Sequence, residues 1–137
     1  RMQNSKLEAR NTKQAQMTEL KNPKQYDLED RTLQFAKKVR EFIRKLPKTK
    51  SNFEDISQLI RSSGSVGANY IEANESFSKK DFVLRIKISR KEAKESRYWL
   101  ILVETNNDLN LDKERNDLIQ EATELMNIFG SIIRKSE

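Results

Sequence analysis

The side chains that could do chemistry in this chain are carboxylates, amines, guanidinium groups and hydroxyls, because its 137 residues include no histidine and no cysteine. This composition excludes thiol nucleophiles, thiolate zinc sites, histidine general bases and the Glu-x-x-His di-iron sites of helical bundles. Glu72, Glu92 and Glu95 could form an acid site or a metal site, but nothing marks one carboxylate as an acid and another as a base. We therefore expect no enzymatic activity, no catalytic residue, no metal and no cofactor.

A structural role suits these carboxylates better. A buried carboxylate without a partner would cost several kcal/mol, so partners should exist. We expect Glu72 and Glu92 to join a polar network with serines and with Asn69, Arg90 or Arg97.

The stretch SSGSVGANYIEANESFSKKDF at residues 62–82 raises the question of a phosphate-binding loop. Its Gly-Ser-Val-Gly tetrad resembles the G-x-x-G loop of KH modules, but no strands flank it and no basic residue follows before Lys79. The Walker and dinucleotide patterns are also missing. If the stretch is helical, Gly64 and Gly67 each cost roughly 1 kcal/mol relative to alanine, and close approach of another backbone would offset that cost.

One face of this predicted helix carries no lysine or arginine, although the protein is rich in both. Its members recur at steps of four and three: Gln58, Ser62, Ser65, Asn69, Glu72 and Ser76. We predict that this face packs against another subunit, or against another helix that lies tightly across it. The alternative is a serine-rich face exposed to solvent.

Basic residues form two rows at helical spacing, in a chain with a formal net charge of +6. The first row is Lys37, Arg40 and Arg44, and the second is Lys80, Lys87, Lys91 and Lys94, which align with Tyr98. Such rows could follow a phosphate backbone while Tyr98 or Trp99 stacks on a base. The alternative is that they only solubilise the protein, with Glu41, Glu95 and Glu104 forming ion pairs along the helices. Trp99 better fits the edge of a core.

Apolar residues at alternating steps of four and three predict four helices. They are expected from Asp27 to Leu46 before Pro47, from Ser51 or Asn52 to Phe77, from the capping box of Ser78 and Asp81 to Val103, and from near Asp112 to Ile133. The apolar stripe of the second helix is predicted as Phe53, Ile56, Ile60, Ser63, Gly67, Tyr70, Asn74 and Phe77. Short connections favour an all-α, antiparallel up-down-up-down four-helix bundle over residues 26–137.

Residues 1–25 are basic and poor in apolar side chains, so we treat them as an extension of the bundle. A short helix around residues 5–21, disorder, and ordering against another chain are the alternatives there. No apolar run approaches the roughly 20 residues needed to span a bilayer, and the first residues lack a signal peptide. We expect a cytoplasmic protein with no membrane partner.

Three segments resemble a known family: YDLEDRTLQFAKKVREFIRKLPK, SGSVGANYIEA and SKKDFVLRIKISRKEAKESRYWL. They are similar to the bacterial four-helix bundle proteins encoded in intervening sequences of large-subunit ribosomal RNA genes, and the resemblance spans roughly residues 26–133. It implies an antiparallel bundle that assembles into a ring-shaped homopentamer, without enzymatic activity. It also implies relatives that include the accessory protein of diversity-generating retroelements, which binds nucleic acid and a reverse transcriptase.

The family motif carries over onto Ser65, Asn69, Glu72, Ala73, Asp81 and Phe82, and the resemblance implies structural roles for them. With the pattern above, the predicted oligomer or helix-packing interface is Ser62, Ser65, Asn69, Glu72 and Ala73. The function expected first is that of a homo-oligomeric protein, pentameric as the resemblance implies, that binds RNA or DNA through the two basic rows. The alternative is an adaptor that recruits an acidic protein, such as a reverse-transcriptase-like enzyme.

Overall fold

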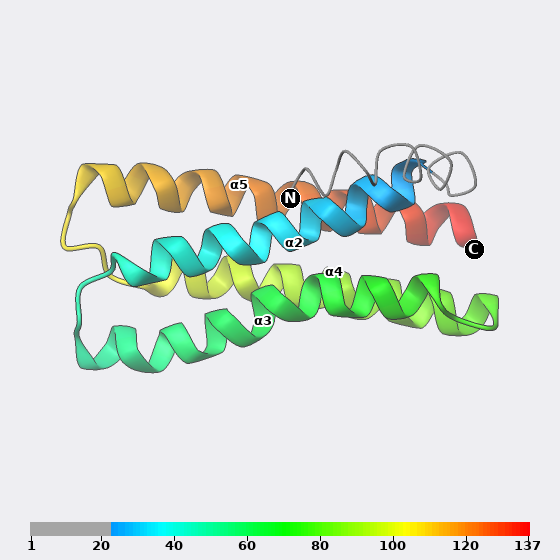
Figure 1. The fold of residues 1–137 in the computed structure, drawn as a ribbon, viewed down its shortest axis with the longest axis horizontal. Helices are drawn as coiled ribbons and strands as arrows, with labels where there is room; N and C mark the ends of the chain where they lie inside the picture. The colour runs from blue at the N-terminus through cyan, green and yellow to red at the C-terminus, as the bar shows by residue number, and fades with distance from the viewer. Residues whose placement is uncertain (1–22) are drawn as a thin grey trace, which may run out of the picture. The chain divides into compact units, whose positions relative to one another are not determined.

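A computed structural model of the chain describes residues 23–137, which form four helices and no strands (Figure 1). These helices are α2 (Pro23–Arg44), α3 (Lys50–Asn74), α4 (Lys79–Leu102) and α5 (Leu109–Ser136). The prediction of an all-α four-helix bundle is confirmed. Nearly all of the expected basic extension lies outside the described residues. By its contacts the chain divides into two units, Arg1–Arg31 and Thr32–Glu137, and the second unit holds α3, α4, α5 and most of α2.

Capping side chains set where the helices begin. The hydroxyl of Ser78 accepts a hydrogen bond from the backbone N–H of Asp81 at 3.1 Å, which is the capping interaction predicted for α4. Thr49 caps α3 in the same way. Helix α5 is capped by Asp108 and so begins earlier than the predicted Asp112. The preceding turn explains the difference, because Asn106 and Asn107 have the positive φ angles, 56° and 61°, that asparagine tolerates better than most residues.

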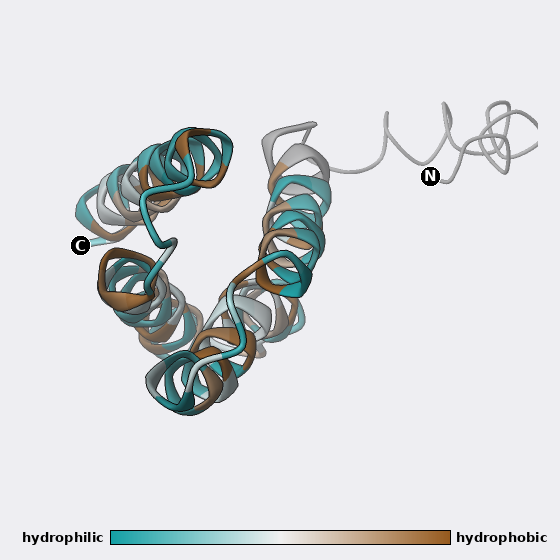
Figure 2. Cartoon of the chain, turned by 90° about the vertical axis from the view of Figure 1, so that its left-hand side faces the viewer, coloured by the Kyte–Doolittle hydropathy of each residue, from teal (hydrophilic) through white to brown (hydrophobic). Residues whose placement is uncertain are grey.

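The core of this unit is aliphatic and aromatic, and α4 packs against both α3 and α5. Figure 2 looks along the helices and shows α4 between these two neighbours. Contacts between α3 and α4 run from Ser62–Ser96 to Asn69–Arg85, so the two helices are antiparallel. The largest fully buried side chains include Phe35, Phe42, Leu59, Ile86, Leu100, Leu125 and Phe129.

The predicted apolar stripe of α3 is wrong in part. Phe53 is 79% exposed, Phe77 is fully exposed, and Ile60 is also exposed. The buried residues are Asn52, Leu59, Ser62, Ser63, Val66, Tyr70 and Ala73, so Ser63 and Tyr70 of the predicted stripe are confirmed as buried. Four of these seven residues carry a polar group, and a pattern of apolar residues alone therefore locates only part of the buried face.

Candidate nucleic-acid interface

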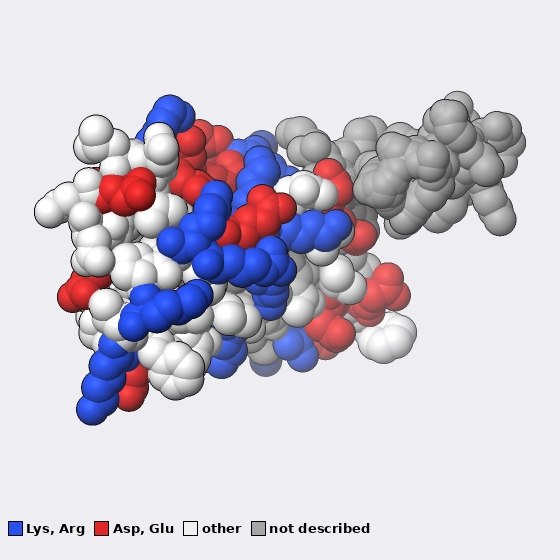
Figure 3. All heavy atoms as spheres, turned by 60° about the vertical axis from the view of Figure 1, so that its left-hand side comes forward, with Lys and Arg blue, Asp and Glu red and all other residues white. Residues whose placement is uncertain are grey.

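The four predicted lysines of α4 lie on its outer surface. Lys80, Lys87, Lys91 and Lys94 are all exposed, and we call them the α4 row. None of them forms an ion pair with a residue of the described range 23–137. The row is thus a strip of positive charge that is open to solvent. Elsewhere too, Lys and Arg side chains gather with a few carboxylates beside them, as the face of the molecule in Figure 3 shows.

Glu95, the carboxylate that lies beside this row in the sequence, forms an ion pair with a residue of another helix. Glu95 pairs with Arg61 of α3, with 3.3 Å between Oε1 and Nη2. Arg61 also lies 3.8 Å from Glu92 Oε1. Glu95 therefore forms no ion pair with the lysines of the α4 row, although the alternative interpretation of the row included such pairs. Its negative charge is largely neutralised by Arg61, so it neutralises little of the charge of the α4 row.

An aromatic pair continues the row towards the end of α4. The Tyr98 side chain is 57% exposed, while Trp99 is half-buried at the predicted edge of the core. Their ring centroids lie 5.0 Å apart with an interplanar angle of 81°, an edge-to-face contact that helps to fix the Tyr98 ring. Such a contact covers at most one face of that ring, so the other is available for stacking.

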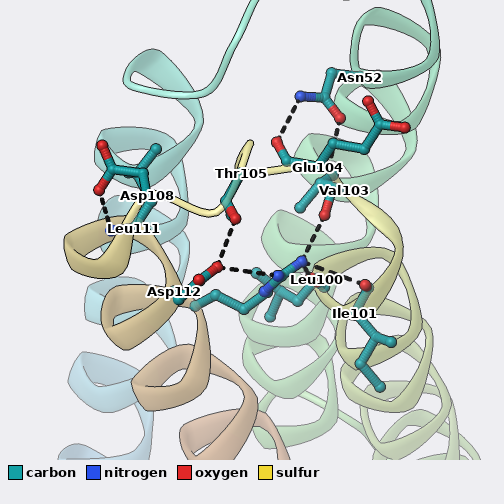
Figure 4. Close-up of polar contacts among 10 residues, drawn as sticks. Asn52, Leu100, Ile101, Val103, Glu104, Thr105, Asp108, Leu111 and Asp112 are labelled. Atoms are coloured by element: carbon teal, nitrogen blue, oxygen red, sulfur yellow. Dashed lines mark hydrogen bonds and ion pairs between the residues drawn. The ribbon is translucent and has the colours of Figure 1, made fainter.

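Polar side chains from neighbouring helices hold this end of α4 (Figure 4). The Arg115 guanidinium of α5 donates hydrogen bonds to the carbonyl oxygens of Leu100, Ile101 and Val103, and it pairs with Asp112 at 3.2 Å. Because the last carbonyls of a helix lack partners within it, Arg115 serves as a cap.

Asn52 of α3 holds the loop that follows α4. Its Nδ2 donates to the carbonyl oxygens of Pro47 at 3.0 Å and Glu104 at 2.9 Å, and its Oδ1 accepts from the Glu104 N–H at 2.8 Å. Asn52 is fully buried, and its hydrogen bonds join α3 to the α2–α3 loop and to the α4–α5 loop. Figure 4 shows the two bonds to Glu104. From the sequence, Asn52 is predicted only as a possible start of the helix.

The basic row predicted on α2 is less uniform. Lys37 and Arg44 are exposed, whereas Arg40 is half-buried and donates to the carbonyl oxygen of Ala36 at 3.2 Å. Arg40 Nη2 lies 3.6 Å from the point where a Cβ of Gly64 would be, so its guanidinium covers α3. Helix α2 and helix α4 contact different faces of α3, and the two rows are therefore separate strips.

The predicted packing face of α3 is partly covered by α4 of the same chain. The hydroxyls of Ser62 and Ser96 are hydrogen-bonded at 2.9 Å, and Ser89 Oγ donates to the carbonyl oxygen of Val66 at 3.0 Å. We call Ser62, Ser89 and Ser96 the hydroxyl seam. Ala73 is also buried. Small side chains at the seam let the two helices lie close together.

The remaining predicted interface residues are accessible. Ser65 and Asn69 are half-buried and Glu72 is exposed. Asn69 Nδ2 donates to the carbonyl oxygen of Ser65 at 2.9 Å, and its Oδ1 accepts from Arg85 Nη1 at 3.0 Å. This edge of α3 is the part of the predicted interface that a second chain could reach.

The polar network expected around Glu92 has other members than predicted. Glu92 is only 7% exposed, and its nearest cation is Arg61, not Arg90 or Arg97. Arg97 instead donates to Thr123 of α5 at 3.2 Å. Within residues 23–137, Glu92 Oε1 accepts no hydrogen bond.

Two further arginines were not assigned to a basic surface by the sequence reading. Arg90 and Arg134 are exposed and meet over Gly130 of α5. Only the antiparallel register of α4 and α5, fixed by contacts such as Arg97–Thr123, brings them together. A pattern of basic residues at helical spacing within one helix cannot reveal a pair whose members come from two helices.

No three of the described carboxylates come together as they would around a metal ion. In the part of the chain that the structure describes, no helix is long and apolar enough to cross a membrane.

Comparisons with known proteins agree with the helical architecture. A family model described as 23S rRNA-intervening sequence protein matches residues 24–131. A similar solved structure is a protein of unknown function from Bacteroides thetaiotaomicron, described as belonging to the S23 ribosomal protein family. It is 30% identical, covers 77% of this chain and 96% of its own, and superimposes with a TM-score of 0.67. A comparison with curated proteins found no match.

Proposed function

Because the chain belongs to the 23S rRNA-intervening sequence protein family, we propose that it is a non-enzymatic homo-oligomer that binds RNA along its basic rows. The observation that carries this proposal is the α4 row, whose four lysines are exposed and form no ion pair with any described residue. The row on α2, formed by Lys37, Arg40 and Arg44, is a second and weaker contact, because Arg40 is half-buried.

The chemistry of the α4 row suits a phosphate backbone. Lysines that neutralise phosphates release condensed counterions, which favours binding at low salt. Beyond the row, the exposed face of Tyr98 offers a surface on which an unpaired base can stack. The family description names an intervening sequence of 23S rRNA, and RNA is therefore the nucleic acid that we propose first.

Charge reversal of the α4 row tests RNA binding. We expect the triple variant Lys87→Glu, Lys91→Glu and Lys94→Glu to bind a short single-stranded RNA at least tenfold more weakly, and the salt dependence of log K to fall by about two. The measurement is an electrophoretic mobility shift over a salt series. Lys38→Glu, Lys48→Glu and Lys50→Glu, three exposed residues outside both rows, give the same net charge and should retain most of the binding. If the wild type gives no shift at low salt, or if the two variants lose binding equally, the proposal is wrong.

Base stacking on Tyr98 has a built-in reporter, because Trp99 is the single tryptophan of the chain. A base on Tyr98 would lie close to Trp99, so RNA should quench tryptophan fluorescence. We expect Tyr98→Ala to abolish the quenching and weaken binding roughly tenfold, whereas Tyr98→Phe should preserve both. If RNA quenches the fluorescence of Tyr98→Ala as much as that of the wild type, Tyr98 does not belong to the binding surface.

Exposed apolar residues support the homo-oligomer. Leu33 and Ile71 are each 50% exposed, and Ile60 is exposed as well. They lie near the place where α2 crosses α3. On α2, Leu33 follows Thr32, which contacts Gly67. On α3, Ile60 comes one turn before Gly64, and Ile71 comes one turn after Gly67. Association of copies would cover these side chains. A homopentamer is the state that the family resemblance implies.

A second candidate function is an adaptor for a protein such as a reverse-transcriptase-like enzyme. It is favoured by the exposed Ile101 and Leu102, which adjoin Tyr98 and offer an apolar contact that RNA does not need. Affinity purification with and without nuclease separates the two functions. A partner that survives nuclease treatment and is lost in Ile101→Asp would favour the adaptor.

A further inference from the structure

Two arginines from different helices converge on one point of the surface. A Cβ built on Gly130 would lie 3.4 Å from Arg134 Nη1 and 3.7 Å from Arg90 Nε. Both nitrogens are thus within 4 Å of a single position above α5. Gly130 itself is buried, and the two guanidinium groups approach the surface of α5 at this place.

No described residue balances the charges of this pair: neither Arg90 nor Arg134 forms an ion pair with another residue of the range 23–137. Two like charges that approach the same point repel each other, and an anion between them is attracted to both. Arg134 lies in the last turn of α5, where the helix dipole favours a cation. That effect accounts for Arg134 alone and gives no reason for Arg90 to approach it.

The pair is continuous with the α4 row. Arg90 lies three residues after Lys87 and four residues before Lys94, so the three side chains are neighbours on the surface of α4. Arg134 carries this positive strip from α4 onto α5. A backbone that followed the α4 row would meet the arginine pair beside it.

We propose that Arg90 and Arg134 together bind one phosphate group, each guanidinium donating to a different phosphate oxygen. Guanidinium groups suit this task because their donors are planar, permanently charged and matched to phosphate geometry. The phosphate could come from an RNA backbone or from free inorganic phosphate. That the phosphate belongs to RNA rests on the function proposed above. In that case the arginine pair is a clamp that holds one backbone phosphate at the edge of the α4 row.

RNA affinity measured with single and double variants tests the clamp. We expect Arg90→Ala and Arg134→Ala each to weaken binding of a short single-stranded RNA roughly tenfold. Because both act on one phosphate, the double variant should lose little more than either single variant. Arg134→Lys should recover part of the affinity. Lys135→Ala is the matched control, since it removes the same charge at the next, exposed residue, and it should have a much smaller effect. Thermal unfolding shows whether each variant remains folded.

Nuclear magnetic resonance of the arginine Nε–H groups separates the two phosphate sources. The resonances of Arg90 and Arg134 should shift on addition of RNA and should shift only weakly with the same concentration of inorganic phosphate. Saturation by inorganic phosphate alone would assign the pair to free phosphate and overturn the RNA source. No shift with either ligand, or a loss in Arg134→Ala no larger than in Lys135→Ala, would overturn the clamp.

These results are independent of the test of RNA binding. If the wild type binds RNA and the α4 row variant does not, the proposed function stands even when the arginine variants bind normally. If the wild type binds no RNA at low salt, the proposed function fails, and the phosphate titration still decides whether the pair holds a phosphate.

Discussion

Gly64 and Gly67 lie one turn apart on α3 and yet differ in the space left for a side chain. A Cβ at Gly64 would meet only the end of the Arg40 side chain, at 3.6 Å. A Cβ at Gly67 would lie 2.8 Å from Thr32 Oγ1 and 3.1 Å from Thr32 Cβ. Thr32 is buried and β-branched, so it cannot move aside cheaply. Only Gly67 is required for the close approach of α2 and α3.

Alanine at these two positions should therefore have opposite effects on stability. Gly64→Ala should raise the free energy of unfolding by up to about 1 kcal/mol, because alanine favours helix. Gly67→Ala should lower it by about 1 to 3 kcal/mol through overpacking against Thr32. Urea unfolding at one fixed protein concentration measures both. A stabilising Gly67→Ala would contradict the close approach of the two helices.

At the scale of elements, the two loops at one end of the bundle depend on a side chain from a helix. Asn52 makes hydrogen bonds to Pro47 and Glu104, which lie in different loops, and it is fully buried. Its amide provides both donors and an acceptor, which no other residue of similar size can supply. This one side chain therefore fixes the spacing between the α2–α3 loop and the α4–α5 loop.

Replacing Asn52 should destabilise the bundle strongly. Asn52→Ala removes three hydrogen bonds and should lower the free energy of unfolding by about 2 to 4 kcal/mol. Asn52→Asp keeps the volume but turns a carboxylate towards two carbonyl oxygens, so it should cost at least as much. Asn116→Ala, at an exposed position of α5, is the control and should change stability by less than about 0.5 kcal/mol. Thermal unfolding monitored by circular dichroism gives the comparison, and equal effects at residues 52 and 116 would refute the role of Asn52.

Signals from neighbouring residues predicted where the helices begin and end better than they predicted which faces of the helices are buried. The cap of α4 by Ser78 and the end of α2 before Pro47 follow from neighbouring residues, and both are found. The buried face of α3 was partly misassigned. Ser63 and Tyr70 of the predicted stripe are buried, but Phe53, Ile60 and Phe77 are exposed, and the buried Ser62 lies outside that stripe, with its hydroxyl bonded to the carbonyl oxygen of Leu59. Serine has no apolar side chain to mark a core position, so the pattern did not distinguish Ser62 from a serine exposed to solvent.

Contacts between side chains of different helices could not be predicted from the sequence pattern. The basic residues of the α4 row are visible as a repeat on one helix. The pairing of Arg61 with Glu95, and the approach of Arg90 to Arg134, depend on register between helices. A shift of one turn would change every such pair without altering any pattern within a helix.

At the scale of the whole molecule, exposed large apolar residues are unevenly distributed. Within residues 23–137 they occur on α2, α3, α4 and the α3–α4 loop, whereas α5 exposes only Leu109, at its first position. Helix α4 exposes Leu84, Tyr98, Ile101 and Leu102, and the last three lie beyond the α4 row. The exposed side chains of α2 and α3 are the ones that we propose to be covered in the homo-oligomer, with α5 facing solvent. The net charge of +6 per chain would accumulate on assembly, which makes apolar contacts the more necessary for holding copies together.

Introducing charge at the α2–α3 face should dissociate the homo-oligomer. Ile60→Asp combined with Ile71→Asp should reduce the mass measured by light scattering to that of one chain, because each buried isoleucine contributes about 1.5 to 3 kcal/mol. Leu109→Asp is the matched control: Leu109 is 83% exposed on α5, and its replacement should leave the mass unchanged. A wild-type protein with the mass of one chain would rule out the homo-oligomer, and an unchanged mass in the double variant would move the interface elsewhere.

The hydroxyl seam limits how this sequence can change. Ser62, Ser89 and Ser96 are fully buried between α3 and α4, so a larger side chain there would overpack the contact between the two helices. Loss of a hydroxyl leaves the backbone hydrogen bonds intact, since the carbonyl oxygens it contacts also belong to helices. Substitution at these positions is therefore tolerated unequally: alanine should cost the least stability, whereas valine and leucine, the usual residues of a helical core, should cost the most.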